Sequence, residues 1–217
     1  RSSAASDVYK RQVIDEVWRL YGEKYRSFGG WYISGEISRA TRGAIGAFHA
    51  MGKQCKEVSG GLPTFISPWI DGKKAVSNAQ NAVTADEHER EWDEIFDGIH
   101  DVVDACAFQD GHIDYDELDL FFSINKRLAD KYGMKLNLEF VPFSNIPGLT
   151  EALAWMDLMD RPNVQVLVDT LHAHRVKVTP EQLREVAAER FGFVHLCDGP
   201  AFIPPVDHPD TVSYTHL

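Results

Sequence analysis

Apolar positions recur along the chain with two different spacings. In some segments they lie three or four residues apart, which is typical of an amphipathic helix, and in others they form short runs that are typical of strands. The strands predicted in this way are residues 30–37, 62–70, 102–110, 135–143, 164–169 and 193–198. The predicted helices are residues 13–25, 42–58, 92–103, 118–133, 149–159 and 179–192. The last of these helices has the clearest end signals, with Thr179 as N-cap, Pro180 in the first helical position and Gly192 as C-cap.

Strands that alternate with helices indicate parallel βαβ units. A doubly wound sheet and a (β/α)8 barrel share this alternation. No Gly-x-Gly-x-x-Gly follows a predicted strand, so nothing supports a dinucleotide-binding fold. Polar residues gather instead at the carboxyl ends of several strands, where the active sites of barrels lie. We therefore expect an α/β fold, a partial (β/α)8 TIM barrel with about six parallel strands.

Charge and composition exclude several kinds of partner. The 217 residues carry a formal net charge of -11, which argues against non-specific nucleic-acid binding because polyphosphate would be repelled. No apolar run approaches the roughly 18 residues of a membrane span. Cys55, Cys106 and Cys197 lie far apart and suggest neither a disulfide framework nor a zinc knuckle. A reducing compartment fits best, and we expect a cytoplasmic protein without nucleic-acid or membrane partners.

The two ends of the chain fit neither neighbouring pattern. Residues 1–12 (RSSAASDVYKRQ) and 211–217 (TVSYTHL) resemble translated adaptor read-through of the kind that borders metagenomic assemblies. We expect both segments to be foreign or disordered tails that pack against little, with both natural termini missing.

Three polar side chains lie near the carboxyl ends of the last three predicted strands. Because successive side chains of a strand point to opposite faces, Glu139, Asp169 and His195 can all point into one barrel mouth. Carboxylate and imidazole ligands of this kind suit Mn²⁺, Mg²⁺, Co²⁺ or Zn²⁺. The alternative is that each is an ordinary loop residue with its polar group satisfied by the protein.

The second half of the chain contains the stretches LEFVPF, VLVDTLHAHR and FVHLCDGPA. With these motifs, residues 138–208 resemble the sugar phosphate isomerase/epimerase family, the xylose-isomerase-like barrels. The resemblance implies that Glu139, Asp169 and His195 bind a divalent metal and that His172 contacts substrate hydroxyls. It also implies a further Glu ligand on a final strand, which this sequence does not contain.

The resemblance implies an isomerase or epimerase that acts on a small carbohydrate or sugar phosphate. The metal would polarise a sugar carbonyl, and Glu139 would move a proton α to that carbonyl through an enediolate. Without the last ligand we expect weak metal binding and negligible turnover. With about six strands, two sheet edges would stay open, and self-association through those edges is expected.

The first half contains GGWYISGEISRA, LPTFISPWIDG and ACAFQDGHIDYDELDLFFSINKRLADKYGM, and it resembles a glycosidase-like barrel family of uncharacterised function. The alternative function is therefore a glycoside hydrolase without metal, with Glu36 and Asp110 as acid and base. Aromatic residues at the strand ends, Trp31 and Trp69, belong either to such a cleft or to the core.

Two different resemblances in one chain favour a chimera joined within residues 131–139. The expected domains are a glycosidase-like half-barrel at 13–134 and an isomerase/epimerase-like half-barrel at 135–210, between the tails 1–12 and 211–217. A non-catalytic carbohydrate-binding protein, or a misassembled product, remains open beside the two enzymes.

Overall fold

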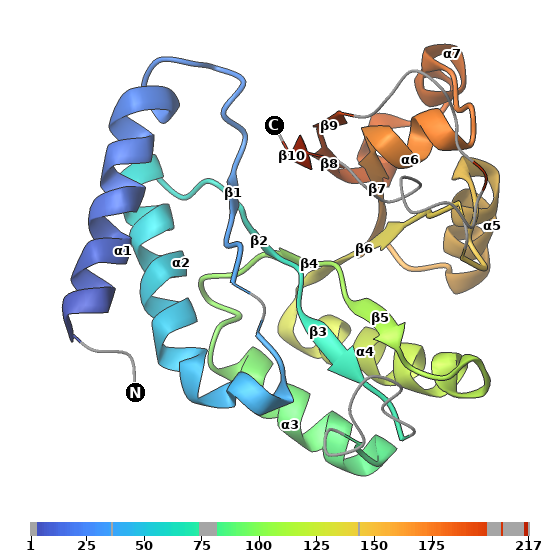
Figure 1. The fold of residues 1–217 in the computed structure, drawn as a ribbon, viewed down its shortest axis with the longest axis horizontal. Helices are drawn as coiled ribbons and strands as arrows, with labels where there is room; N and C mark the ends of the chain where they lie inside the picture. The colour runs from blue at the N-terminus through green and yellow to red at the C-terminus, as the bar shows by residue number, and fades with distance from the viewer. Residues whose placement is uncertain are drawn as a thin grey trace. The chain divides into compact units, whose positions relative to one another are not determined.

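The structure is a computed structural model that describes residues 4–35, 37–73, 82–142, 144–198, 205 and 215–216 (Figure 1). The chain divides into two compact units, residues 1–134 and 135–217. Within the described residues, six parallel strands alternate with helices, three strands in each unit. The predicted α/β fold, a partial (β/α)8 barrel, is confirmed. None of the helices in the described ranges is long and apolar enough to cross a membrane.

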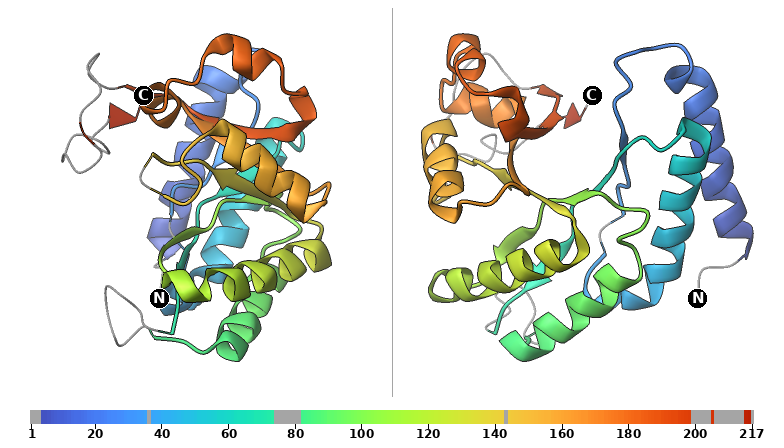
Figure 2. Two further views of the ribbon diagram at one scale, coloured as in Figure 1. Left: turned by 90° about the vertical axis from the view of Figure 1, so that its right-hand side faces the viewer. Right: turned by 180° about the vertical axis from the view of Figure 1, so that it is seen from behind.

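The first unit contains a parallel sheet in the order β1-β2-β4 and a second parallel pair, β3 and β5. The strands of this unit are β1 (Trp31–Tyr32), β2 (Thr64–Ile66), β3 (Trp69–Asp71), β4 (Ala105–Cys106) and β5 (Gln109–His112). The helices are α1 (Ala4–Val17), α2 (Ile45–Ser59), α3 (Ala85–Asp97) and α4 (Leu118–Tyr132). Helices α3 and α4 lie side by side in both views of Figure 2.

The core of the first unit is built on the helical stripe that the sequence predicts. Trp92, Ile95 and Phe96 of α3 are almost completely buried. Helix α3 begins at a capping box, in which the Thr84 hydroxyl accepts a hydrogen bond from the Glu87 amide and the Glu87 carboxylate accepts one from the Thr84 amide. Apolar burial on one face and a satisfied amino end together fix this helix.

The second unit contains a parallel sheet in the order β6-β7-β8 and an antiparallel pair, β9 and β10. The strands are β6 (Lys135–Glu139), β7 (Val164–Asp169), β8 (Phe191–His195), β9 (Cys197–Asp198) and β10 (Thr215–His216). The helices are α5 (Leu149–Met159), α6 (Thr170–Arg175) and α7 (Pro180–Arg184). Every residue of β7 is buried, as its continuous apolar run predicts.

Several predicted elements differ from the observed ones. Helix α1 begins at Ala4, before the predicted start at residue 13 and inside the segment predicted as a tail; the origin of residues 1–12 stays a prediction. The predicted strands 62–70 and 102–110 are each divided, into β2 and β3 and into β4 and β5. In the first case Pro68, which has no amide hydrogen, lies at the division.

The predicted helix 179–192 is wrong in its second half. Thr179 caps α7 as expected, but α7 ends at Arg184, and β8 begins at Phe191. Gly192 is not a C-cap, because it lies within β8, where an added Cβ would stand 1.9 Å from Asn137 Oδ1. Pairing of β8 with β7 and this close approach outweigh the helical propensity of the sequence.

Candidate metal centre

The carboxyl ends of β6, β7 and β8 bring Glu139, Asp169 and His195 to one edge of the second unit's sheet. Glu139 is the last residue of β6, Asp169 of β7 and His195 of β8. Asp169 is directly opposite His195 in the parallel register. In a parallel sheet this is the edge at which barrels carry their active sites.

Asp169 is 1% exposed, and its two carboxylate oxygens have different surroundings. Oδ1 accepts hydrogen bonds from the amides of Leu171 (2.7 Å) and His172 (3.3 Å), so Asp169 is the N-cap of α6. Oδ2 accepts a hydrogen bond from the thiol of Cys197 at 3.0 Å. His195 Nδ1 lies 3.8 Å from the same Oδ2 atom. One oxygen therefore shapes the backbone, while the other faces the candidate site.

Helix α6 brings His172 to the same place. His172 Nε2 lies 3.8 Å from Glu139 Oε1, and ligand atoms of Glu139, Asp169 and His172 all lie within 4.8 Å of one another. His172 is 6% exposed, and its Nδ1 has no hydrogen-bond partner among the described residues. Two carboxylates and an imidazole thus converge on one point.

The electrostatics of this cluster favour proton exchange at Glu139. Burial, and then the nearby charge of Asp169, raise the pKa of Glu139 to about 7. Burial lowers the pKa of His172, which keeps this imidazole neutral and able to bind a metal. Oxygen and nitrogen donors of this kind fit a divalent transition metal or Mg²⁺.

The strand pattern and the family resemblance predict Glu139, Asp169 and His195 as metal ligands and His172 as a substrate contact. In the structure the histidine that completes the compact group is His172, while His195 lies beside Asp169. The individual roles stay predictions.

Cys197 and Thr170 were not singled out from the sequence. Cys197 donates its thiol hydrogen bond to Asp169, and the Thr170 hydroxyl contacts the backbone of Cys197. The only sequence signal was that Cys197 is two residues after His195, on the same strand face. His174 and Arg175 also belong to α6, and Arg175 is buried.

The alternative site of the first unit cannot be assembled. Glu36 lies outside the described residues, and of Asp110 only the backbone, in β5, is described. Trp31 belongs to the core, since it is 8% exposed and its indole Nε1 donates a hydrogen bond to Ser59 Oγ at 3.1 Å. Trp69 begins β3 and is half-buried.

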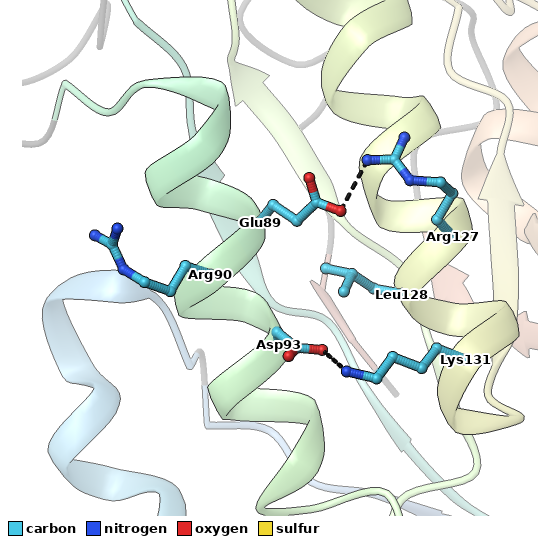
Figure 3. A pocket seen from close by; sticks show the side chains of 6 residues that line it. All are labelled: Glu89, Arg90, Asp93, Arg127, Leu128 and Lys131. Atoms are coloured by element: carbon cyan, nitrogen blue, oxygen red, sulfur yellow. Dashed lines mark hydrogen bonds and ion pairs between the residues drawn. The ribbon is translucent and has the colours of Figure 1, made fainter.

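A hollow between α3 and α4, outside the candidate metal centre, is lined mainly by charged side chains (Figure 3). Glu89 pairs with Arg127 at 2.8 Å, and Asp93 pairs with Lys131 at 2.5 Å. Because these charges neutralise each other across the two helices, the hollow fits helix packing better than ligand binding.

Comparison with known families gives one match, to a sequence model described as a domain of unknown function (DUF4434), over residues 4–167. This range begins within the predicted tail and runs through residues 131–139, and a junction there stays a prediction. No curated protein matches the sequence.

Solved structures support the barrel fold. A candidate alpha-L-fucosidase from Bacteroides thetaiotaomicron VPI-5482 is 58% identical over 71% of this chain, with a TM-score of 0.60. The chain spans about half of that protein, 53% of its length. A D-allulose 3-epimerase from Methylomonas sp., solved with D-allulose, is 18% identical over 95% of this chain and 72% of its own, with a TM-score of 0.60. The IOLI protein, solved with a zinc atom, is 16% identical over 93% of this chain and 70% of its own, with a TM-score of 0.52. At these identities the last two show the fold alone.

Proposed function

We propose that the chain, which belongs to the DUF4434 family, contains the metal centre of a sugar isomerase or epimerase. The observation that carries the proposal is the convergence of Glu139, Asp169 and His172, with His195 beside Asp169. The substrate class proposed is a small carbohydrate or sugar phosphate. The barrel fold shared with a D-allulose 3-epimerase and with a zinc-containing protein supports the same assignment.

In the proposed reaction Glu139 is the proton carrier. Without metal its pKa is about 7, and a bound divalent cation would lower this pKa, so Glu139 would be ionised and able to take up a proton at neutral pH. Glu139 takes the proton α to the sugar carbonyl, and the electron pair of the broken C–H bond forms the enediolate double bond. Return of the proton by Glu139 to the neighbouring carbon gives the isomer. The epimer requires a second acid that delivers a proton to the other face of the same carbon.

The other residues hold and orient the reacting groups. Glu139, Asp169 and His195 would hold a divalent metal, and His172 would donate a hydrogen bond to a substrate hydroxyl. The metal, when bound, would supply polarisation of the carbonyl and its neighbouring hydroxyl. The 30% exposure of the Glu139 side chain leaves it open to substrate on one side.

Metal affinity is the direct test. Purified protein is titrated with Mn²⁺ or Zn²⁺, and we expect Glu139→Ala to reduce the affinity at least tenfold. Asp169→Asn tests the ligand role more specifically. The Asn side-chain oxygen can still cap α6, while an NH₂ group, which donates hydrogen bonds and cannot bind a metal, replaces Oδ2. Equal metal content in the wild type and Glu139→Ala would remove the site.

The two histidines can be separated in the same titration. If the roles are as proposed, His195→Ala lowers metal affinity, whereas His172→Ala keeps the metal and lowers the affinity of the metal-loaded protein for a sugar. His174→Ala is the matched control, because His174 belongs to the same short helix and is exposed. The reverse pattern would make His172 the ligand, as its place in the compact group suggests.

A second candidate function is favoured by the 58% identity to the candidate alpha-L-fucosidase. Here the chain would be part of a glycoside hydrolase that uses Glu36 and Asp110 as acid and base without metal. Hydrolysis of an aryl α-L-fucoside that persists in EDTA and is lost in Glu36→Gln and Asp110→Asn would establish this function. Hydrolysis abolished by EDTA would exclude it.

A further inference from the structure

One hydroxyl group connects the segments that follow β7 and β8. Thr170 Oγ1 donates a hydrogen bond to the Cys197 carbonyl at 2.9 Å and accepts one from the Cys197 amide at 2.8 Å. A hydroxyl has one proton to donate and lone pairs to accept, so both contacts can form together. Both backbone polar groups of Cys197 are thus bound by one side chain.

These two hydrogen bonds take over where the ladder between the strands stops. The parallel register of β7 and β8 ends at the pair of Asp169 and His195, and the next residue, Leu196, is 63% exposed. Beyond this point Thr170 holds the chain in place of a further strand residue. Together with the pairing of Cys197 and His216 between β9 and β10, these bonds fix the segment directly beside the candidate metal centre.

The side chain of Cys197 also contacts the candidate metal centre. With its backbone held by Thr170, Cys197 places its thiol 3.0 Å from Asp169 Oδ2. His195, two residues earlier, has Nδ1 3.8 Å from the same oxygen. In the described structure the hydrogen bonds of the Thr170 hydroxyl go to the backbone of Cys197, so the hydroxyl acts on the centre through that backbone.

We propose that Thr170 is a positioning residue whose hydroxyl fixes the backbone of Cys197 and thereby holds His195 and the Cys197 thiol against Asp169. The metal-related part of this inference rests on the proposed function; the structural part does not. An outer residue that orients metal ligands typically contributes a factor of about 10–100 to metal affinity. Thr170 would contribute in this range without touching metal or substrate.

The test uses three variants of the whole chain. Thr170→Val keeps the shape of the side chain and removes the hydroxyl, and Thr170→Ser keeps the hydroxyl and removes the methyl group. Thr150→Val, at an exposed position of α5, is the matched control for the change itself. Thermal unfolding of each variant reports whether it folds, and Thr170→Ala replaces the valine variant if that one does not.

The first readout is Co²⁺ affinity, together with the visible spectrum of bound Co²⁺, which reports ligand geometry. We expect Thr170→Val to weaken Co²⁺ binding about 10- to 100-fold and to change the spectrum. Thr170→Ser and Thr150→Val should match the wild type within a few-fold. Unchanged affinity and spectrum in Thr170→Val, or no restoration by serine, would overturn the proposal.

The second readout needs no metal. Amide hydrogen exchange, followed by NMR in EDTA, should show the Cys197 amide protected in the wild type, Thr170→Ser and Thr150→Val and unprotected in Thr170→Val. Exchange that is equal in all four proteins would overturn the proposal. If the wild type binds no Co²⁺, the proposed function fails, and this exchange pattern alone decides whether Thr170 holds the segment.

Discussion

Replacement of Glu139 by Gln should make the metal-free protein more stable at alkaline pH. Burial and the charge of Asp169 raise the pKa of Glu139 from 4.5 to about 7. The folded protein therefore keeps a proton, between about pH 4.5 and pH 7, that the unfolded chain has already released. The free energy of unfolding of the wild type must fall as pH rises through this window, and a Gln side chain has no such proton to lose.

The size of the effect follows from the shift. One unit of pKa corresponds to about 1.4 kcal/mol, so a shift from 4.5 to about 7 would give about 3 kcal/mol in a fully shielded site. Solvent reaches 30% of the Glu139 side chain and screens part of this energy. We expect Glu139→Gln to exceed the wild type by about 1–2 kcal/mol above pH 7 and to equal it below about pH 4.5.

Urea unfolding in EDTA at about pH 5 and about pH 8 measures this difference. Glu185→Gln, a change at an exposed glutamate of the same unit, is the control and should give no pH-dependent difference. A saturating metal should reverse the order at about pH 8, because a ligand at 100 times its Kd stabilises the folded wild type by about 2.7 kcal/mol. A difference that is the same at both pH values, or a wild type more stable in EDTA at alkaline pH, would refute the reasoning.

Three further changes, two in the second unit and one in the first, are tested by urea unfolding. Asn137→Leu should stabilise the protein by about 1–2 kcal/mol. The Asn137 side chain is 8% exposed, and neither of its amide atoms has a hydrogen-bond partner among the described residues. A loss of stability would mean that the amide binds an ordered water. Gly192→Ala should destabilise by about 1–3 kcal/mol through its clash with Asn137, and Asn137→Ala in the same chain should recover part of that loss. Thr84→Ala should cost about 0.5–2 kcal/mol by removing the cap of α3 and leave metal affinity unchanged.

Helices and strands could be predicted from the sequence where the apolar residues follow one clear spacing. The apolar run of β7 and the helix α5 have the predicted bounds, because each follows one clear pattern. The second half of the predicted helix 179–192 could not be read, because the position of Gly192 is decided by Asn137 on a distant strand. Local propensity holds no information about such an approach.

For the candidate centre, too, local sequence patterns predicted positions on strands but not the contacts between distant segments. Alternation along the strands placed Glu139, Asp169 and His195 at the strand ends, which the structure agrees with. It did not predict α6, which is needed to bring His172 to Glu139. Which residues meet at the candidate centre depends on the path of the chain after β7. That path begins as α6, because the Asp169 side chain caps this helix.

The capping role of Asp169 limits what it can offer a cation. Since Oδ1 already accepts two amide hydrogen bonds, only Oδ2, which also accepts the Cys197 thiol, could bind a metal unless the first turn of α6 opened. Asp169 would then be a monodentate ligand. Ca²⁺ seeks six to eight oxygens and often takes both oxygens of a carboxylate, whereas smaller transition metals accept fewer donors and include nitrogen among them. If a metal binds here, a cation that demanded both oxygens of Asp169 would have to unwind the first turn of α6 to obtain the second one.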